Sequence, residues 1–412
     1  MAAVQGGMMG AIEATQPAGR ISRQAVAIGI VTALVGYGSS VTVVINGLVA
    51  MGATTGQAAS GLLALGVAMG VTAILLSLVH RMPISIAWST PGAALLATTG
   101  PVVGGFAAAE GAFAVTGLLV VVAGLWRPIG RLVAAIPASL ANAMLGGILL
   151  DLCLAPFHAL AAIPLLAFPV VLTWLLVGRF ARLYAVPAAA IVTLVLLGLD
   201  VGGAGPHGLA LDHLRPELVL TAPVFSWSAI VGIALPLFVV TMASQNVPGL
   251  AVLATYGFRP PPRPIFLVTG IASLVTAPFG ALTVNLAAIT AALCAGPDAD
   301  PVPERRTAAA VTAGLVYLML GLLSAAAAAV VATAPPLLIE AVAGLALLGA
   351  FGASVSAALK EEGERNAALV TFLLAASGLS FFGIGSAFWG LVGGLAVFGL
   401  KRLDFSRLGF PE

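Results

Sequence analysis

The sequence has very little charge for its length. Of its 412 residues, 8% are charged and 60% are hydrophobic, and the mean hydropathy is +1.13. A soluble domain needs a polar surface that this composition cannot supply, so the chain is expected to form many membrane spans. The formal net charge of +2 lacks the basic excess of nucleic-acid-binding proteins, and no nucleic-acid partner is expected.

Cysteine is also nearly absent. Cys153 and Cys294 are the only two cysteines, and both lie in apolar surroundings. They are expected to be small buried hydrophobic residues and not a disulfide or a metal pair, and no metal or other cofactor is expected. Residues 1–23 lack the apolar core of a cleavable signal peptide and are expected to form a cytoplasmic tail.

Apolar runs separated by proline, glycine and charged residues predict fourteen membrane spans. They lie near 24–49, 57–79, 83–100, 107–125, 133–152, 159–177, 184–199, 225–254, 264–277, 279–295, 307–332, 336–357, 366–382 and 386–402. Several are shorter than the ~20 residues of a straight span, so some must be half-helices or partly extended. A polar segment at 200–222 separates the two sets of seven and contains His207, Asp212, His213, Arg215 and Glu217.

The distribution of lysine and arginine predicts the orientation, because cytoplasmic loops carry most of the positive charge. With the N-terminus inside, sixteen of the seventeen basic residues fall on the cytoplasmic side, and only Arg215 lies outside. An odd number of spans per half makes the halves inverted relative to each other, as in many secondary transporters. We therefore expect an all-α integral membrane protein with 7+7 inverted repeats at 24–199 and 223–402, an outer loop at 200–222 and a cytoplasmic tail at 403–412.

Two stretches inside the apolar runs change from a strand pattern to a helix pattern. In 83–96, Ile84, Ile86 and Trp88 alternate with small or polar residues until Thr90-Pro91. Thr90 is expected to cap the helix that follows, with Pro91 at its first position. The stretch 278–290 is the expected counterpart in the second repeat, and there Asn285 or Thr283 is the expected cap.

These stretches predict an anion-binding site in the middle of the membrane. A strand can exist in lipid only where it is buried in protein or lines a cavity. Inversion would bring the half-helices of spans 3 and 10 together at their N-termini, where free N–H groups and partial positive charge favour an anion. Apart from Asp151 and Glu340, no ionisable residue is expected inside the apolar runs, so backbone dipoles and neutral side chains would hold a carboxylate. The alternative is that Thr90-Pro91 only kinks a helix.

Neutral polar side chains gather where inversion would place them. Gln245 and Asn246 are followed by a helix breaker, which favours substrate contact over the alternative of hydrogen bonds between helices. For Tyr37 and Asn46 the two roles are equally expected. The predicted substrate-binding residues are Ser89, Thr90, Pro91, Gly92, Ser244, Gln245, Asn246, Thr283, Val284, Asn285, Leu286, Tyr37 and Asn46.

Three stretches carry a resemblance to a known family. They are Ser89-Thr-Pro-Gly92 followed by Ala-Ala-Leu-Leu, Met242-Ala-Ser-Gln-Asn-Val-Pro-Gly249, and 278–290. Over about 22–402 the chain resembles the bacterial benzoate:proton symporters of the BenE family. The resemblance implies the fold of the uracil, nucleobase–ascorbate and sulfate-permease transporters and a place in the bacterial inner membrane with both termini cytoplasmic. It also implies a core of spans 1–4 and 8–11 that moves like an elevator against a gate of spans 5–7 and 12–14, commonly in a homodimer.

One departure from the nucleobase members of that wider fold concerns the substrate. Those members carry acidic residues on spans 8 and 10, where this chain has Ser244-Gln245-Asn246 and Thr283-Val284-Asn285. An acidic residue there would repel an anion, so its absence favours a carboxylate. An aromatic ring would fit beside Trp88 or Phe279.

The proton route and the rival functions stay open. Asp151 and Glu340 lie at pseudo-equivalent outer ends of spans 5 and 12 and are candidates for proton coupling, although residues so near a membrane face are more often solvated. A nucleobase or sulfate permease of the same fold is the alternative function. An anion channel would need a continuous polar pore, and an enzyme would need a nucleophile with its base or a metal cluster, which the apolar runs lack.

Overall fold

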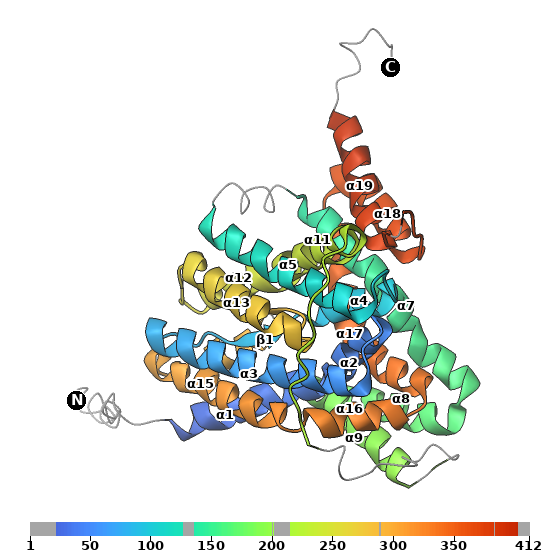
Figure 1. Ribbon diagram of the computed structural model, residues 1–412. Coiled ribbons are helices and arrows are strands. Elements are labelled where there is room, and N and C mark those ends of the chain that lie inside the picture. Colours follow the sequence, from blue (N-terminus) through green and yellow to red (C-terminus); the bar gives the residue numbers. More distant parts are fainter. Residues whose placement is uncertain are drawn as a thin grey trace, which may run out of the picture.

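The computed structural model describes residues 22–126, 136–199, 201, 215–287, 290–382 and 384–402. Most of these residues are helical (Figure 1). Several parts of the sequence-based expectations lie outside the described residues. They are most of the N-terminal tail, the C-terminal tail, two of the arginines expected on the cytoplasmic side (Arg127 and Arg131), and His207, Asp212 and His213 of the expected outer loop.

The first half of the chain forms helices whose starts are set by local capping. Ser22 accepts a hydrogen bond from the Ala25 amide at the start of α1, and Thr54 and Gln57 form a reciprocal capping box at the start of α3. The elements are α1 Arg23–Gly38, α2 Val41–Ala50, α3 Thr55–His80, β1 Ile86–Trp88, α4 Thr90–Thr99, α5 Gly105–Leu125, α7 Ala138–Ala162, α8 Pro164–Phe180, η1 Arg182–Tyr184 and α9 Ala185–Gly198.

The second half opens with one long helix that contains two wide π-helical turns. A proline follows each turn, Pro236 after η4 and Pro248 after η5, and the extra residue relieves the clash of a proline ring with the preceding turn. The elements are α10 Trp227–Ala229, η4 Ile230–Ala234, α11 Leu235–Thr241, η5 Met242–Asn246, α12 Val247–Thr255, α13 Pro262–Thr276, η6 Ala277–Phe279, β2 Val284–Leu286, α14 Ala291–Ala295, η7 Pro303–Arg306, α15 Thr307–Gly321, α16 Ser324–Thr333, α17 Pro336–Ala358, η8 Glu362–Glu364, α18 Arg365–Ala376 and α19 Ser386–Arg402.

The apolar helices confirm a multi-pass membrane protein. Seven described helices are long and apolar enough to cross a membrane, and the pair α15 and α16, bent by 57°, would make an eighth. Three further apolar helices are shorter, at Pro164–Phe180, Arg182–Gly198 and Ser386–Leu400. Each of the fourteen predicted ranges overlaps at least one described helix, while the exact number of crossings stays a prediction.

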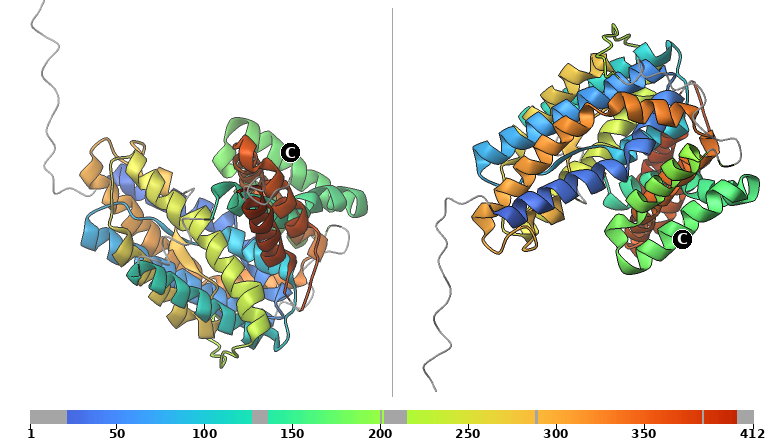
Figure 2. Two further views of the ribbon diagram at one scale, coloured as in Figure 1. Left: turned by 90° about the horizontal axis from the view of Figure 1, so that it is seen from above. Right: turned by 90° about the horizontal axis from the view of Figure 1, so that it is seen from below.

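The helices pack as two groups, which Figure 2 shows side by side. In the first group α3 packs on α15, α5 on α13, α1 on α15 and α2 on α4. The second group, drawn mostly in green and red, consists of α7, α8, α9, α17, α18 and α19, with α7 packed on both α17 and α18. Contacts of α4 with α7 and of α2 with α17 join the two groups.

The two strands pair with each other inside the first group. β1 runs antiparallel to β2, with Ala87 opposite Asn285. A buried serine binds the backbone at or just before each strand. The Ser77 Oγ of α3 accepts a hydrogen bond from the Ile84 amide, two residues before β1 (3.2 Å), and the Ser273 Oγ of α13 accepts one from the Val284 amide at the start of β2 (2.9 Å). The extended backbone is therefore enclosed in protein, as lipid requires.

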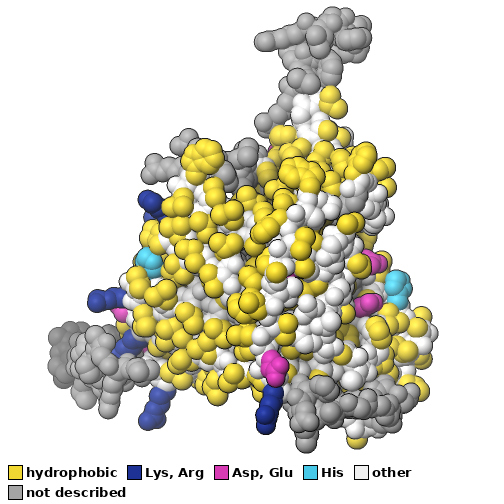
Figure 3. Space-filling model, in the orientation of Figure 1, with side chains coloured by type: hydrophobic (Ala, Val, Ile, Leu, Met, Phe, Trp, Pro, Cys, Tyr) yellow, Lys and Arg dark blue, Asp and Glu magenta, His cyan; other side chains and the backbone are white. Residues whose placement is uncertain are grey.

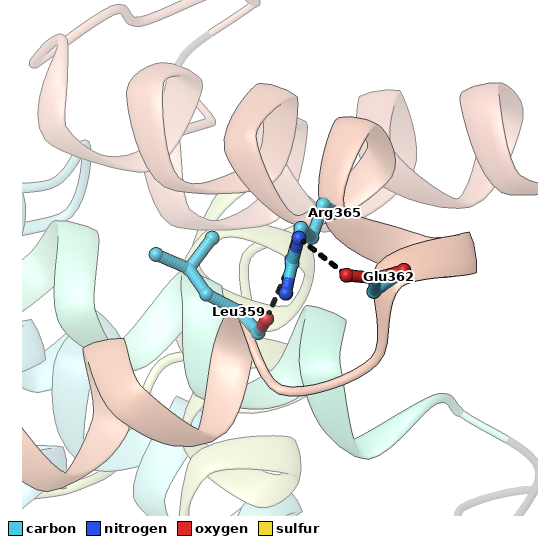
Figure 4. A network of polar contacts seen from close by, with 3 residues as sticks. All are labelled: Leu359, Glu362 and Arg365. Carbon is cyan, nitrogen blue, oxygen red and sulfur yellow. Dashed lines mark hydrogen bonds and ion pairs between the residues drawn. The ribbon is translucent and has the colours of Figure 1, made fainter.

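Most charged residues lie at the ends of the helices or in the turns between them. Figure 3 shows a largely hydrophobic face with charged side chains mainly along its margins, the distribution expected where lipid covers the middle. In the turn between α17 and α18, Arg365 donates from Nε to the Leu359 carbonyl (2.9 Å) and pairs with Glu362 (3.2 Å; Figure 4). This exposed ion pair orders the turn and adds little stability.

Glycine allows α3 and α15 to touch backbone to backbone, which generates a prediction. A Cβ at Gly66 would lie 2.7 Å from the Gly321 Cα and 3.0 Å from the Tyr317 carbonyl oxygen. We expect Gly66→Ala to push the helices apart and lower the stability by about 1–3 kcal/mol. Gly56→Ala on the same helix is the control, because a Cβ there meets nothing within 4 Å. Thermal unfolding in detergent measures both variants, and equal melting temperatures would contradict the prediction.

Candidate functional site

Ser89, and not Thr90, caps helix α4. The Ser89 Oγ accepts a hydrogen bond from the Gly92 amide (3.1 Å), and the helix begins at Thr90 with Pro91 in second position. The expectation that Thr90 is the cap and Pro91 the first helical residue was wrong by one position. Pro91 is still harmless there, because the first-turn amides of a helix have no acceptor within the helix.

The second strand-to-helix stretch differs more from expectation. Helix α14 follows Thr290, and Thr290 makes no side-chain cap. Asn285 lies within β2, where its Nδ2 donates to the Leu286 carbonyl (2.9 Å), so the expected capping of this helix by Asn285 or Thr283 was wrong. With five residues against ten in α4, α14 supplies the weaker dipole.

Three buried hydroxyl groups join the elements at the start of α4. The Thr241 Oγ1 of α11 donates to the Ser89 Oγ (3.1 Å) and lies 3.3 Å from the Thr283 Oγ1. All three side chains are fully buried. The link fixes the beginning of α4 against α11 and the segment before β2.

Asn246 holds the other edge of β2. Its Oδ1 accepts a hydrogen bond from the Leu286 amide (3.0 Å), and its Nδ2 contacts the Met242 sulfur (3.2 Å). The neighbouring Ser244 donates to the Val240 carbonyl one turn earlier (2.6 Å). The polar pattern around η5 thus serves in part to position the strand.

A cavity of about 90 Å³ lies where the two strand-to-helix stretches meet α1, α3, η5 and α15. Two predicted binding residues, Thr90 and Gln245, line it. Its full lining is Val35, Gly36, Ser39, Ser40, Met69, Ala87, Trp88, Thr90, Gln245, Ala287, Thr290 and Tyr317. The lining residues contain no ionisable acid, lysine, arginine or histidine, so the polar groups that face the cavity are hydroxyls, an amide and backbone.

Trp88 forms an aromatic wall of this cavity. Its indole Nε1 donates to the Ser40 Oγ (2.8 Å), which in turn donates to the Gly36 carbonyl (2.8 Å). The Tyr37 ring packs on Trp88 with 5.2 Å between the ring centroids. The Tyr37 hydroxyl is buried without a hydrogen-bond partner among the described residues. This arrangement holds the indole ring at a fixed angle beside the cavity.

The other predicted binding residues are not among those that line the cavity. Tyr37 belongs to α1 and Asn46 to α2. In α4, Pro91 is buried, and Gly92 packs so closely on Leu237 that a Cβ would not fit. Their roles in binding, like those of Ser89, Ser244, Asn246, Thr283, Val284, Asn285 and Leu286, stay predictions.

Several lining residues are not among the predicted binding residues. Ser39 and Ser40 lie at the break between α1 and α2, and the run Gly36-Tyr-Gly38 before two serines was a usable signal for that break. Thr290 was the last residue of the predicted stretch 278–290 and was not among the predicted binding residues. Tyr317 is a lone tyrosine in an apolar run and carried no signal.

The expected positions of acidic residues need one correction. Glu110 lies inside α5 and is 1% exposed, so the expectation that only Asp151 and Glu340 occur within the apolar runs was wrong. Asp151 is exposed on α7 and Glu340 is half-buried on α17, and neither lines the cavity. Their coupling role stays a prediction. Among the described residues there is no group of three metal-ligating side chains.

Comparison with known proteins finds relatives along almost the whole chain. A family model described as "Benzoate membrane transport protein" matches residues 19–400. The inner membrane protein YdcO of Escherichia coli (strain K12) is 43% identical over 368 residues, which cover 89% of this chain and 93% of that protein. The benzoate membrane transport protein of Acinetobacter baylyi is 35% identical over 333 residues, which cover 81% of this chain and 84% of that protein.

Solved structures share the fold at low sequence identity. The structure of SLC26A9 matches with a TM-score of 0.62 and 13% identity, covering 91% of this chain and 65% of that one. The transmembrane domain of the cyanobacterial bicarbonate transporter BicA matches with a TM-score of 0.54 and 17% identity, covering 92% of this chain and 97% of that one. The chain therefore has the fold of these transporters.

The hydrogen bond from the Leu286 amide to Asn246 generates a second prediction. Asn246→Ala would leave a buried amide of β2 without its acceptor, and we expect a loss of stability of about 1–3 kcal/mol. Asn142→Ala on α7 is the control, because the Asn142 Nδ2 donates to the Ala138 carbonyl only one turn away (2.7 Å). Melting temperatures in detergent compare the two, and an equal loss in both would show that β2 does not depend on Asn246.

Proposed function

The chain belongs to the benzoate membrane transport protein family, and from this premise we propose that it imports benzoate or a similar aromatic carboxylate together with protons. It is a membrane transporter and not an enzyme. The observation that carries the proposal is the uncharged cavity between the two strand-to-helix stretches. We expect the protein to work in a bacterial inner membrane, with both termini cytoplasmic, as a homodimer.

The lining of the cavity favours an aromatic anion. Thr90 lies in the first turn of α4, where the backbone dipoles favour negative charge. Gln245 supplies an amide, and Trp88 offers a ring against which a benzoate ring would stack. A carboxylate side chain in the wall would repel such a substrate, and the lining contains none.

Matching contacts in the two halves support the inverted repeat. Gly47 on α2 packs against the Ala93 carbonyl of α4, and Gly249 on α12 packs against the Ala287 carbonyl after β2, with no room for a Cβ at either glycine. Ser77 and Ser273 likewise hold the two strands. The glycine contacts join predicted spans 1 and 3 in the first half and the equivalent spans 8 and 10 in the second. The serine contacts join spans 2 and 3 in the first half and the equivalent spans 9 and 10 in the second.

The two helix groups support an elevator-like movement. The cavity is lined by residues of the first group, which corresponds to the predicted core of spans 1–4 and 8–11. The second group corresponds to the predicted gate of spans 5–7 and 12–14. In this proposal the core carries the substrate along the gate, and the contacts of α4 with α7 and of α2 with α17 change during the movement.

Uptake into proteoliposomes tests the proposed function. We expect labelled benzoate to accumulate when the outside is more acidic than the inside, and unlabelled benzoate to compete where uracil and sulfate do not. Competition by uracil or sulfate would favour a nucleobase or anion permease of the same fold. Accumulation that ignores the gradient would reject proton coupling, and a steady uncoupled current in a bilayer would favour an anion channel.

The position of Thr90 predicts a specific loss of affinity. Removing its hydroxyl in Thr90→Ala would weaken benzoate binding by about 1 kcal/mol, roughly fivefold in Kd. Thr98→Ala is the matched control, because Thr98 lies on the same helix, donates to the Ala94 carbonyl (3.2 Å) and does not line the cavity. Calorimetric titration measures both affinities, and an unchanged affinity in Thr90→Ala would move the carboxylate site away from α4.

A further inference from the structure

Glu110 is a buried acidic side chain that the cavity does not use. It lies in the second turn of α5 and is 1% exposed. Neither of its carboxyl oxygens has a well-formed hydrogen bond with a described residue. The Thr221 hydroxyl lies beside it. A polar group this buried and this poorly paired is unusual in a folded protein and points to a role beyond packing.

A segment that links the two halves of the chain covers Glu110. This segment, residues 215–226, is named the strap here and crosses the first helix group as a yellow-green tube in Figure 1. The Val219 amide donates to the Ser60 Oγ (2.9 Å), the Thr221 amide to the Pro278 carbonyl (2.9 Å) and the Val224 amide to the Ala107 carbonyl (2.9 Å). Gly111 packs so closely on the Val224 carbonyl that it has no room for a Cβ.

No positive charge compensates Glu110 among the elements that pack on α5. The helices α10, η4 and α11 and the turn η6 contain no ionisable side chain. The only one on α13 is Arg263, which lies beside Gly124 at the opposite end of α5. In the strap, Arg215 and Glu217 are exposed. A carboxyl group in this setting is stable as the neutral acid, because an unpaired charge would be buried at high cost.

Glu110 also differs from the other acidic residues in its place. Asp151 and Glu340 belong to the second helix group, where they are exposed or half-buried. Within the described part of the first group, Asp298, Asp300 and Glu304 lie in the turn before α15, and Glu110 alone lies inside a helix long enough to cross a membrane. A proton on Glu110 would therefore travel with the group that lines the cavity.

Short contacts connect the surroundings of Glu110 with the cavity wall. Helix α5 packs on η6, and η6 leads through residues 280–283 to β2. Thr283 there lies 3.3 Å from Thr241, which donates to Ser89 at the start of α4. Any shift of η6 when the strap moves is thereby passed to the segment that carries Thr90.

We propose that Glu110 binds the cotransported proton, which it takes up from the expected outer side when the strap separates from α5 and keeps while the strap is closed. The inference rests on the proposed function and names the proton site within it. In its ionised form Glu110 would need water, so the strap could close over it only after protonation. After the first helix group has moved, the strap separates from α5 again and the carboxyl group releases the proton to water on the inner side, so only the O–H bond of Glu110 forms and breaks.

Glu110→Gln tests this role, because glutamine has the shape of the neutral acid and cannot release a proton. Two measurements are made on proteoliposomes: accumulation of labelled benzoate under a pH gradient, and exchange of labelled for unlabelled benzoate at equal pH on both sides. We expect Glu110→Gln to lose accumulation while exchange persists. Glu217→Gln makes the same chemical change on the exposed surface of the strap and should keep both.

The outcomes separate the two proposals. Accumulation by Glu110→Gln as in the wild type would overturn the role of Glu110 and leave the proposed function intact. If the wild type neither exchanges nor accumulates benzoate, the proposed function is rejected. If the wild type exchanges benzoate without accumulating it, proton coupling is rejected, and so is the role of Glu110 as the proton site.

Infrared spectroscopy of the wild type gives a test that does not depend on whether the Glu110→Gln variant folds. A band from a neutral carboxylic acid should change when benzoate binds, and it should remain in Glu217→Gln. A wild type without such a band would overturn the proposal. Glu110→Asp keeps an ionisable group on a shorter side chain, so benzoate accumulation should persist with a shifted pH dependence. Complete loss of accumulation in Glu110→Asp, with exchange retained, would also argue against the proposal.

Discussion

The pairing of β1 with β2 is the constraint on which the rest of the site depends. Backbone amides and carbonyls inside a membrane protein must be bonded, and an extended segment cannot satisfy its own. Here two three-residue strands from distant parts of the chain satisfy each other, with Ser77, Ser273 and Asn246 completing their edges. Because both strands are held in this way, α4 can begin in the interior and present its first turn to a cavity.

In the proposed site, uncharged groups would bind a charged substrate. A buried arginine would bind a carboxylate tightly, but it would also have to be desolvated in every state of the cycle. Dipoles of a helix start and hydroxyl groups are weaker and stay satisfied by their neighbours when the site is empty. Ser89 illustrates the point, because its hydroxyl bonds both Gly92 and Thr241 within the protein.

The sequence predicted the features that depend on neighbouring residues. The alternation up to Trp88 and the proline at 91 located the switch from strand to helix, since both signals are local. Ser89 and Thr90 are adjacent and equally able to cap a helix, so the cap was misplaced by one residue. The bond from Trp88 to Ser40 joins distant segments and could not be foreseen, and Glu110 was overlooked because only alanine and glycine flank it.

The contacts between glycine residues on α3 and α15 bear on how such a protein changes during evolution. Where Gly66 meets Gly321 and Gly70 meets the Gly314 carbonyl, the helices cannot accept even one added carbon atom without moving. The spacing of α3 and α15 beside the cavity therefore cannot change gradually through small substitutions at these glycines. If substrate binds as proposed, a change of substrate would require exchanges of side chains that face the cavity, such as Ser39 or Thr290, and not a change in the spacing of these helices.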